Sequence, residues 1–99
     1  MARDNKGAKV KGERIAVFHP EFIEDLRYWV EQDRRIALKA FNLIEAILRQ
    51  TFTGIGKPEP LKADLTGYWS RRINDEHRLV YSATATEIII IACRYHYSK

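Results

Sequence analysis

The chain has 99 residues, which is enough for one domain and too short for two. Its 45% hydrophobic content allows a small core, and its formal net charge of +4 favours an anionic partner: nucleic acid, an acidic protein or an anionic surface. The single cysteine, Cys93, excludes an internal disulfide and lies in an apolar run, so we expect a buried thiol in a reducing cytoplasm. Neither an apolar run of about 18 residues nor a signal peptide is visible, which argues against a membrane protein. Because the histidines and the cysteine lack the spacing of zinc ligands, we expect no metal and no cofactor.

The N-terminal part of the chain is polar and then becomes apolar. Residues 1–14 are lysine-rich and aperiodic, so we predict a flexible basic extension, with the domain occupying residues 15–99. The run IAVF at 15–18 predicts a short buried strand. Pro20 suits the first turn of a helix over about 20–31. The apolar stripe of this helix consists of Phe22, Leu26, Trp29 and Val30.

A second helix is predicted directly after the first. Asp33 is expected to be its N-cap, and the helix runs to about Gln50. The short break at 32–33 makes the two helices a hairpin. The apolar stripe of the second helix consists of Ile36, Ala40, Leu43, Ile44, Ile47 and Leu48, which we interpret as core positions and not as a ligand site.

The loop predicted at 53–66 contains the sequence GKPEP, in which one carboxylate, Glu59, stands between two prolines. Each proline disfavours the α region for the residue before it, so Lys57 and Glu59 are expected to be extended. A conformationally restricted acid loses little entropy when it is held in one geometry. Taken by itself, however, the spacing favours a rigid turn over a functional site.

Three strands are predicted after this loop. GYWSRRI at 67–73 and HRLVYS at 77–82 form a hairpin around Asn74 and Asp75. EIIIIACRYHY at 87–97 is apolar enough to be buried on both faces over much of its length. The order β-α-α-β-β-β predicts an α+β domain in which a helical hairpin covers one face of a mainly antiparallel sheet.

Alternation along the strands sorts the side chains between the two faces of the sheet. The sequence does not give the registers, but one arrangement places Arg72, Arg78 and His96 on one face, near the returning 53–66 loop. The opposite face would then carry most of the core: Trp69, Ile73, Leu79, Ile89, Ile91 and Cys93. In the alternative interpretation, Arg71 and Arg72 are solvated strand charges. His77, beside a turn, is interpreted as structural or exposed.

These side chains fit cleavage of RNA without a metal. The reaction needs a base for the 2′-OH, positive charge for the phosphorane and an acid for the departing 5′-oxygen. Glu59 is the candidate base, and His96 is the candidate acid because an imidazole exchanges protons near neutral pH. The candidates for binding phosphate or stacking on a base are Lys62, Arg72, Arg78, Tyr95 and Tyr97. The alternative for His96 is a frayed residue near the C-terminus.

The string GKPEPLKADLTGYWSRRINDEHRLVY at 56–81, followed by ACRYHY at 92–97, resembles the YoeB (Txe) branch of the RelE-type toxins. The resemblance covers about residues 15–97 and is specific, since GKPEPLK, GYWSRRI, EHRLVY and RYHY occur in the family's order and spacing. It implies a compact fold like that of microbial ribonucleases. It also implies a cytoplasmic toxin of a type II toxin–antitoxin system that cleaves mRNA in the ribosomal A site and so inhibits translation.

The resemblance also implies a role for each matching residue. Glu59 matches the general base, Arg78 the residue that stabilises the transition state, and His96 the general acid. The supporting positions of the family match Lys62, Arg72 and Tyr97.

The partners implied by the resemblance are an antitoxin of the YefM or Phd type, the 70S ribosome and mRNA, with operator DNA bound only together with the antitoxin. A homodimer is compatible with it. Two features depart from the family pattern: the basic N-terminal extension, and Ser98 and Lys99, which displace the terminal carboxylate from Tyr97. Two alternatives stay open: a catalytically silent basic module that binds an antitoxin and operator DNA, and a ribonuclease that cuts free RNA.

Overall fold

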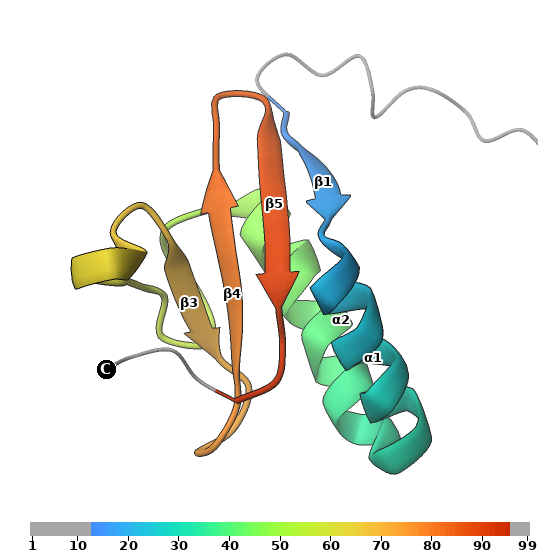
Figure 1. The fold of residues 1–99 in the computed structure, drawn as a ribbon. Coiled ribbons are helices and arrows are strands. Elements are labelled where there is room, and N and C mark those ends of the chain that lie inside the picture. The colour runs from blue at the N-terminus through green and yellow to red at the C-terminus, as the bar shows by residue number, and fades with distance from the viewer. Residues whose placement is uncertain (1–12, 96–99) are drawn as a thin grey trace, which may run out of the picture.

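The structure, a computed structural model, describes residues 13–95. Within this range five strands form one sheet in the order β1-β5-β4-β3-β2, and two helices cover one face of it (Figure 1). The strands are β1 (Ile15–Phe18), β2 (Glu59–Pro60), β3 (Trp69–Arg72), β4 (Arg78–Ala83) and β5 (Glu87–Ala92). The helices are α1 (Pro20–Gln32), α2 (Arg34–Arg49) and the short 3-10 helix η2 (Ala63–Leu65). The predicted α+β fold with a helical hairpin on one face is confirmed.

The helices begin where their capping residues predict. Asp33 is the N-cap of α2, and its carboxylate accepts a hydrogen bond from the main-chain N of Arg35 at 3.2 Å. In α1, Phe22 and Trp29 are buried as predicted. Val30, however, is 45% exposed, and its assignment to the core stripe was wrong. One position beyond Trp29 the helix has turned by about 100°, so Val30 lies on the flank of the buried stripe.

The sheet is mixed and contains one strand that was not predicted. β1 pairs with β5 in parallel, whereas the other three pairings are antiparallel. The additional strand, β2, has two residues, and its Glu59 and Pro60 lie opposite Ser70 and Trp69 of β3. The extended conformation of Glu59 lets this segment join the sheet, and Pro60 is tolerated because β2 is an edge strand.

A β-bulge in β5 explains an error in the predicted core. Ile90 and Ala92 lie opposite consecutive residues of β4, so Ile91 is an extra residue. The bulge shifts the alternation by one position. Ile88 and Ile90 are therefore completely buried against the helices, whereas Ile89 and Ile91, which were predicted to be core, are only partly buried.

After the bulge, the residues that face the helices are again the ones that the sequence predicted, and Cys93 is buried as expected. The strand ends at Ala92, well before the predicted position 97. The main-chain N of Cys93 donates a hydrogen bond to the carboxylate of Asp25 at 3.0 Å, and Tyr95 has a φ of +64°. Both features are incompatible with a continued strand.

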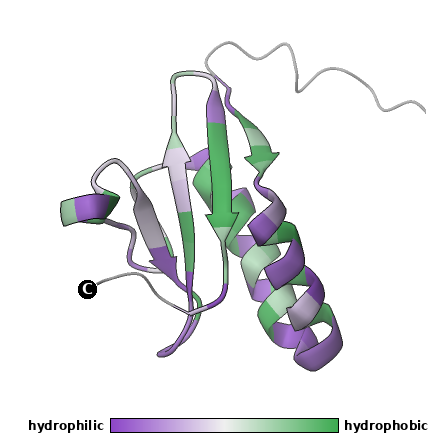
Figure 2. Ribbon diagram, in the orientation of Figure 1, coloured by the Kyte–Doolittle hydropathy of each residue, from purple (hydrophilic) through white to green (hydrophobic). Residues whose placement is uncertain are grey.

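The core lies between the helices and the face of the sheet that carries Leu79, Tyr81 and Ile88. Apolar residues run along β5 and β1, whereas the helices alternate between polar and apolar positions (Figure 2). Within residues 13–95, no helix is long and apolar enough to cross a membrane. The buried core cluster consists of Phe22, Trp29, Ala37, Ala40, Leu43, Ile44, Ile47, Ile73, Leu79, Tyr81, Ile88, Ile90 and Cys93.

Arg14 ties the start of the domain to the rest of the fold. Its Nε donates to the carbonyl of Thr84 at 2.7 Å, and its Nη1 donates to the hydroxyl of Thr51 at 3.1 Å. The boundary predicted after residue 14 therefore falls just beyond an anchored side chain. Residues 1–12 of the predicted flexible extension lie outside the described part of the chain, and the extension stays a prediction.

The thiol of Cys93 should make stability fall in alkali. Burial, with a smaller effect of the Asp25 carboxylate, raises the pKa of this thiol from 9.0 to about 12. Between these values the unfolded chain ionises while the folded chain keeps the proton, so the free energy of unfolding falls as pH rises. Burial also raises the pKa of Tyr81, which adds to the trend. In urea titrations Cys93→Ala should therefore lose stability less steeply than the wild type between about pH 9 and 12. Identical slopes would exclude Cys93 as a source.

Candidate active site

Glu59 and Arg78 form an ion pair that bridges three strands. Arg78 begins β4, and its Nη1 lies 3.1 Å from Oε1 of Glu59 on β2. The same nitrogen donates to the hydroxyl of Ser70 on the intervening β3 at 3.3 Å. The Glu59 side chain is 54% exposed and that of Arg78 only 15%. An accessible carboxylate is thus held against a guanidinium that the sheet itself orients.

Arg72 lies directly opposite Arg78 in the β3–β4 ladder. Paired residues project to the same face, which here is the face away from the helices, because Leu79 and Tyr81 project into the core. Two like charges opposite each other are unfavourable unless an anion neutralises them. Glu59 is one such anion, and a phosphate group would be another. The predicted placement of Arg72 and Arg78 on one face is confirmed.

The loop that leads to Glu59 is fixed on β3 by a main-chain contact. The N of Arg72 donates to the carbonyl of Gly56 at 2.6 Å. Gly56 has a φ of +84°, and a Cβ there would lie 2.9 Å from Leu43, so glycine is required. Lys57 follows with a φ of +50°, which shows that its predicted extended conformation was wrong. Closing this turn outweighs the influence of Pro58, while Glu59 is extended in β2 as predicted.

Arg71 is completely buried, so its interpretation as a solvated charge was wrong. Its guanidinium holds the segment that follows α2, where the negative end of the helix dipole favours a cation. It donates to the carbonyls of Gln50, Thr51 (3.3 Å), Thr53 (2.8 Å) and Ile55 (3.1 Å) and to the hydroxyl of Tyr81 (3.3 Å). One signal in the sequence pointed to this role: Arg71 alternates in phase with Trp69 and Ile73, both of which were assigned to the core.

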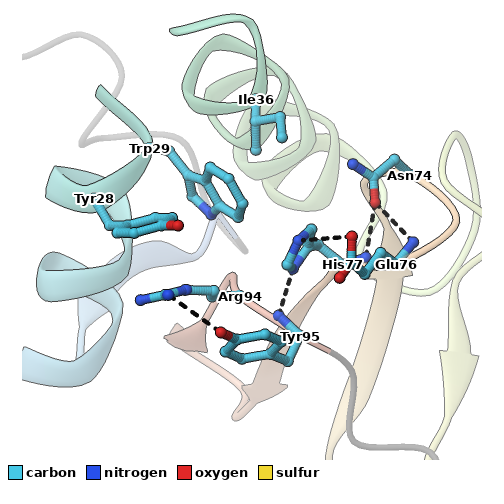
Figure 3. A pocket seen from close by; sticks show the side chains of 8 residues that line it. All are labelled: Tyr28, Trp29, Ile36, Asn74, Glu76, His77, Arg94 and Tyr95. Carbon is cyan, nitrogen blue, oxygen red and sulfur yellow. Dashed lines mark hydrogen bonds and ion pairs between the residues drawn. The ribbon is translucent and has the colours of Figure 1, made fainter. Parts of the chain in front are cut away.

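His77 is buried, so of its two interpretations, structural or exposed, the structural one is correct. Its ring is buried against Trp29, with ring centroids 4.6 Å apart, and its Nδ1 accepts a hydrogen bond from the N of Tyr95 at 2.6 Å (Figure 3). It lines a pocket of about 310 Å³ between the helices and the β3–β4 turn. The pocket is lined by Tyr28, Trp29, Ile36, Asn74, Glu76, His77, Arg94 and Tyr95.

The structure brings together Glu59, Arg72 and Arg78 of the predicted site. Lys62 is exposed at the N-cap of η2, shortly after β2, and within residues 13–95 no hydrogen bond or salt bridge joins its side chain to Glu59 or Arg78. His96 and Tyr97 lie outside the described residues, so their roles stay predictions. Among residues 13–95, no group of histidine, cysteine, aspartate and glutamate side chains could hold a metal ion.

The sequence and the fold are similar to those of bacterial toxins. Residues 18–97 match the family model of the YoeB-like toxin of bacterial type II toxin–antitoxin systems. Toxin YoeB of Mycobacterium bovis is 52% identical over 84 residues, which cover 85% of this chain and 99% of that protein. The YoeB dimer from Staphylococcus aureus has a TM-score of 0.78 and 45% identity, covering 86% of this chain and 99% of that one. The heterotetrameric YoeB–YefM toxin–antitoxin complex of the same organism gives 0.76 and 47%, covering 83% and 95%.

Proposed function

The chain belongs to the YoeB-like toxins of bacterial type II toxin–antitoxin systems, and from this membership we propose that it is a ribosome-dependent endoribonuclease. It cleaves mRNA in the ribosomal A site without a metal and so inhibits translation in the cytoplasm. The observation that carries the proposal is the contact of 3.1 Å between the accessible carboxylate of Glu59 and the guanidinium of Arg78, with Arg72 opposite Arg78 on the same face.

In the proposed reaction, the carboxylate of Glu59 takes the proton of a ribose 2′-OH, and the 2′-oxygen attacks the adjacent phosphorus. The bond from phosphorus to the 5′-oxygen breaks, and His96 protonates that oxygen. The products are a 2′,3′-cyclic phosphate and a 5′-OH. Arg78 contacts the phosphorane oxygens, where fixed positive charge lowers the barrier most effectively. Arg78 therefore both orients the base and stabilises the charge that the base helps to create.

The remaining residues of the proposed site support binding. The position of Arg72 opposite Arg78 supports a contact with the same phosphate, and a guanidinium suits bidentate contact. Lys62, exposed shortly after β2, contributes charge toward the RNA backbone. Tyr97 stacks on a base.

The proposed partners follow from the relatives. Because the Staphylococcus aureus YoeB is found in a complex with YefM, we propose an antitoxin of the YefM or Phd type for this chain, with operator DNA bound only through that complex. The dimer of the same relative supports a homodimer as the free form. The 70S ribosome and mRNA are the proposed targets.

The proposal is tested by mapping the cuts in a defined mRNA. Ribosomes carrying a known A-site codon are mixed with the purified protein, with enough EDTA to remove transition metals while Mg²⁺ stays in excess. We expect a cut within the A-site codon that leaves a 2′,3′-cyclic phosphate and is absent for His96→Ala. The same RNA without ribosomes should stay intact. Equal cutting of free RNA would make the protein a general ribonuclease, and no cutting beside an active control toxin would favour a silent binding module.

A further inference from the structure

We infer that His77 is a positioning residue for the proposed RNA cleavage, because it fixes the main chain of Tyr95, the residue that directly precedes His96. The inference rests on the proposed function, in which His96 is the general acid. His77 has no part in the proposed chemistry, and its position beside a turn gave no sign of a functional role.

Both main-chain polar groups of Tyr95 are held by two consecutive residues. The N of Tyr95 donates to Nδ1 of His77 at 2.6 Å (Figure 3). The N of Arg78 donates to the carbonyl of Tyr95 at 3.0 Å. The side chain of the same Arg78 contacts Glu59. The consecutive residues His77 and Arg78 therefore contact both the proposed base, Glu59, and Tyr95, which precedes the proposed acid in the sequence.

Tyr95 adopts a backbone conformation that must be held in place. Its φ of +64° lies in the left-handed region, which is unfavourable for a residue with a Cβ. Such conformations persist where the surroundings impose them, and they are concentrated at functional sites. Here the two hydrogen bonds from His77 and Arg78 impose it. The φ of Tyr95 sets the direction in which the main chain leaves this residue, which is the last described residue before His96.

His77 is itself held in one orientation. The side-chain oxygen of Asn74 accepts a hydrogen bond from the N of His77 at 2.8 Å, and the ring packs edge-on against Trp29. Because Nδ1 accepts the hydrogen bond from Tyr95, Nδ1 carries no proton, and the ring proton lies on Nε2. Nε2 is 3.6 Å from the carboxylate of Glu76. An apolar side chain could fill this buried space, but it could not accept the hydrogen bond from Tyr95.

The first test compares two substitutions of His77. Asparagine can present its amide oxygen near the position of Nδ1, whereas leucine fills the space without an acceptor. We expect His77→Leu to lower kcat for cleavage on ribosomes by about tenfold or more, with KM changed by less than about twofold, and His77→Asn to recover most of the loss. Equal effects of the two substitutions, or an effect on KM alone, would overturn the inference.

The second test does not depend on the folding of a His77 variant. Tyr95→Gly and Tyr95→Val both remove the exposed ring, but only glycine adopts a positive φ freely. We expect the glycine variant to cleave at least about tenfold faster than the valine variant. If the two are equally active, the left-handed conformation is irrelevant to catalysis and the inference fails.

A measurement on the wild-type protein reads out the contact itself. In protein labelled with ¹⁵N, a scalar coupling between the amide nitrogen of Tyr95 and Nδ1 of His77 is expected across the hydrogen bond, and its absence would overturn the inference. Failure of the proposed function is distinguishable from failure of the inference. A wild type that does not cleave RNA refutes both, whereas a wild type that cleaves together with unaffected variants refutes only the role of His77.

Discussion

Glu59→Gln should reduce the rate of RNA cleavage on ribosomes by at least about 10²-fold, the lower end of what a general base contributes. Glutamine has the size of glutamate and keeps an oxygen that can accept from Arg78, so the guanidinium stays oriented. The amide cannot take the proton of the 2′-OH. The loss should therefore appear in the single-turnover rate at saturating protein, which reports the chemical step and not the binding of RNA.

The same substitution should hardly affect stability. The Glu59 side chain is 54% exposed, and ion pairs that solvent screens contribute at most about 1 kcal/mol. A matched control is Glu45→Gln, which neutralises an exposed carboxylate on α2, away from the sheet edge that carries Glu59. The control should cleave at the wild-type rate. Full activity of Glu59→Gln, with unfolding midpoints equal to those of the control, would show that another group takes the proton.

Local features allowed most of the fold to be predicted from the sequence. The limits of the helices follow from Pro20, from the cap at Asp33 and from the spacing of apolar residues, all of which act within a few positions along the chain. The strand β2 and the bulge at Ile91 could not be predicted in this way. Both depend on which residues of a distant strand lie opposite, and the sequence of one strand does not contain its register.

The candidate site shows the same division. Alternation allowed one arrangement in which Arg72 and Arg78 share a face, and the structure has that arrangement. The prolines around Glu59 predicted its extended conformation. The contact between Glu59 and Arg78 needed the register of three strands, and β2 was not foreseen. Arg71 was misinterpreted for a different reason: charge argued for exposure, whereas phase along the strand argued for burial. The burial that the alternation favoured is correct, because main-chain carbonyls satisfy the hydrogen-bond donors of a buried guanidinium as fully as water does.

Arg71→Met should cost about 3 to 5 kcal/mol of unfolding free energy, because several acceptors lose their donor at about 1 to 3 kcal/mol each. Methionine has a similar length and is apolar, so it fills much of the space but donates to none of the carbonyls after α2. The contact with the Thr51 carbonyl is buried, whereas those with the Thr53 and Ile55 carbonyls are partly buried, and removal of the buried charge offsets part of the loss. The measurement is urea unfolding followed by circular dichroism, with Arg35→Met as the control, because the Arg35 side chain is 91% exposed. The control should stay within about 0.5 kcal/mol of the wild type.

Tyr81→Phe separates the contribution of Tyr81 from that of Arg71 in holding the segment after α2. The Tyr81 hydroxyl donates to the carbonyl of Thr51 at 2.7 Å and accepts from Nε of Arg71 at 3.3 Å, so its removal alone should cost about 1 kcal/mol. The hydrogen bond between Arg71 and Tyr81 is lost in either single variant, so it is counted twice in the sum. The double variant should therefore lose less than the sum of the single losses. Strict additivity would mean that the two side chains act independently. If Arg71→Met were as mild as Arg35→Met, water would have to reach the carbonyls after α2, and the loop that leads to Glu59 would not depend on Arg71 for its position.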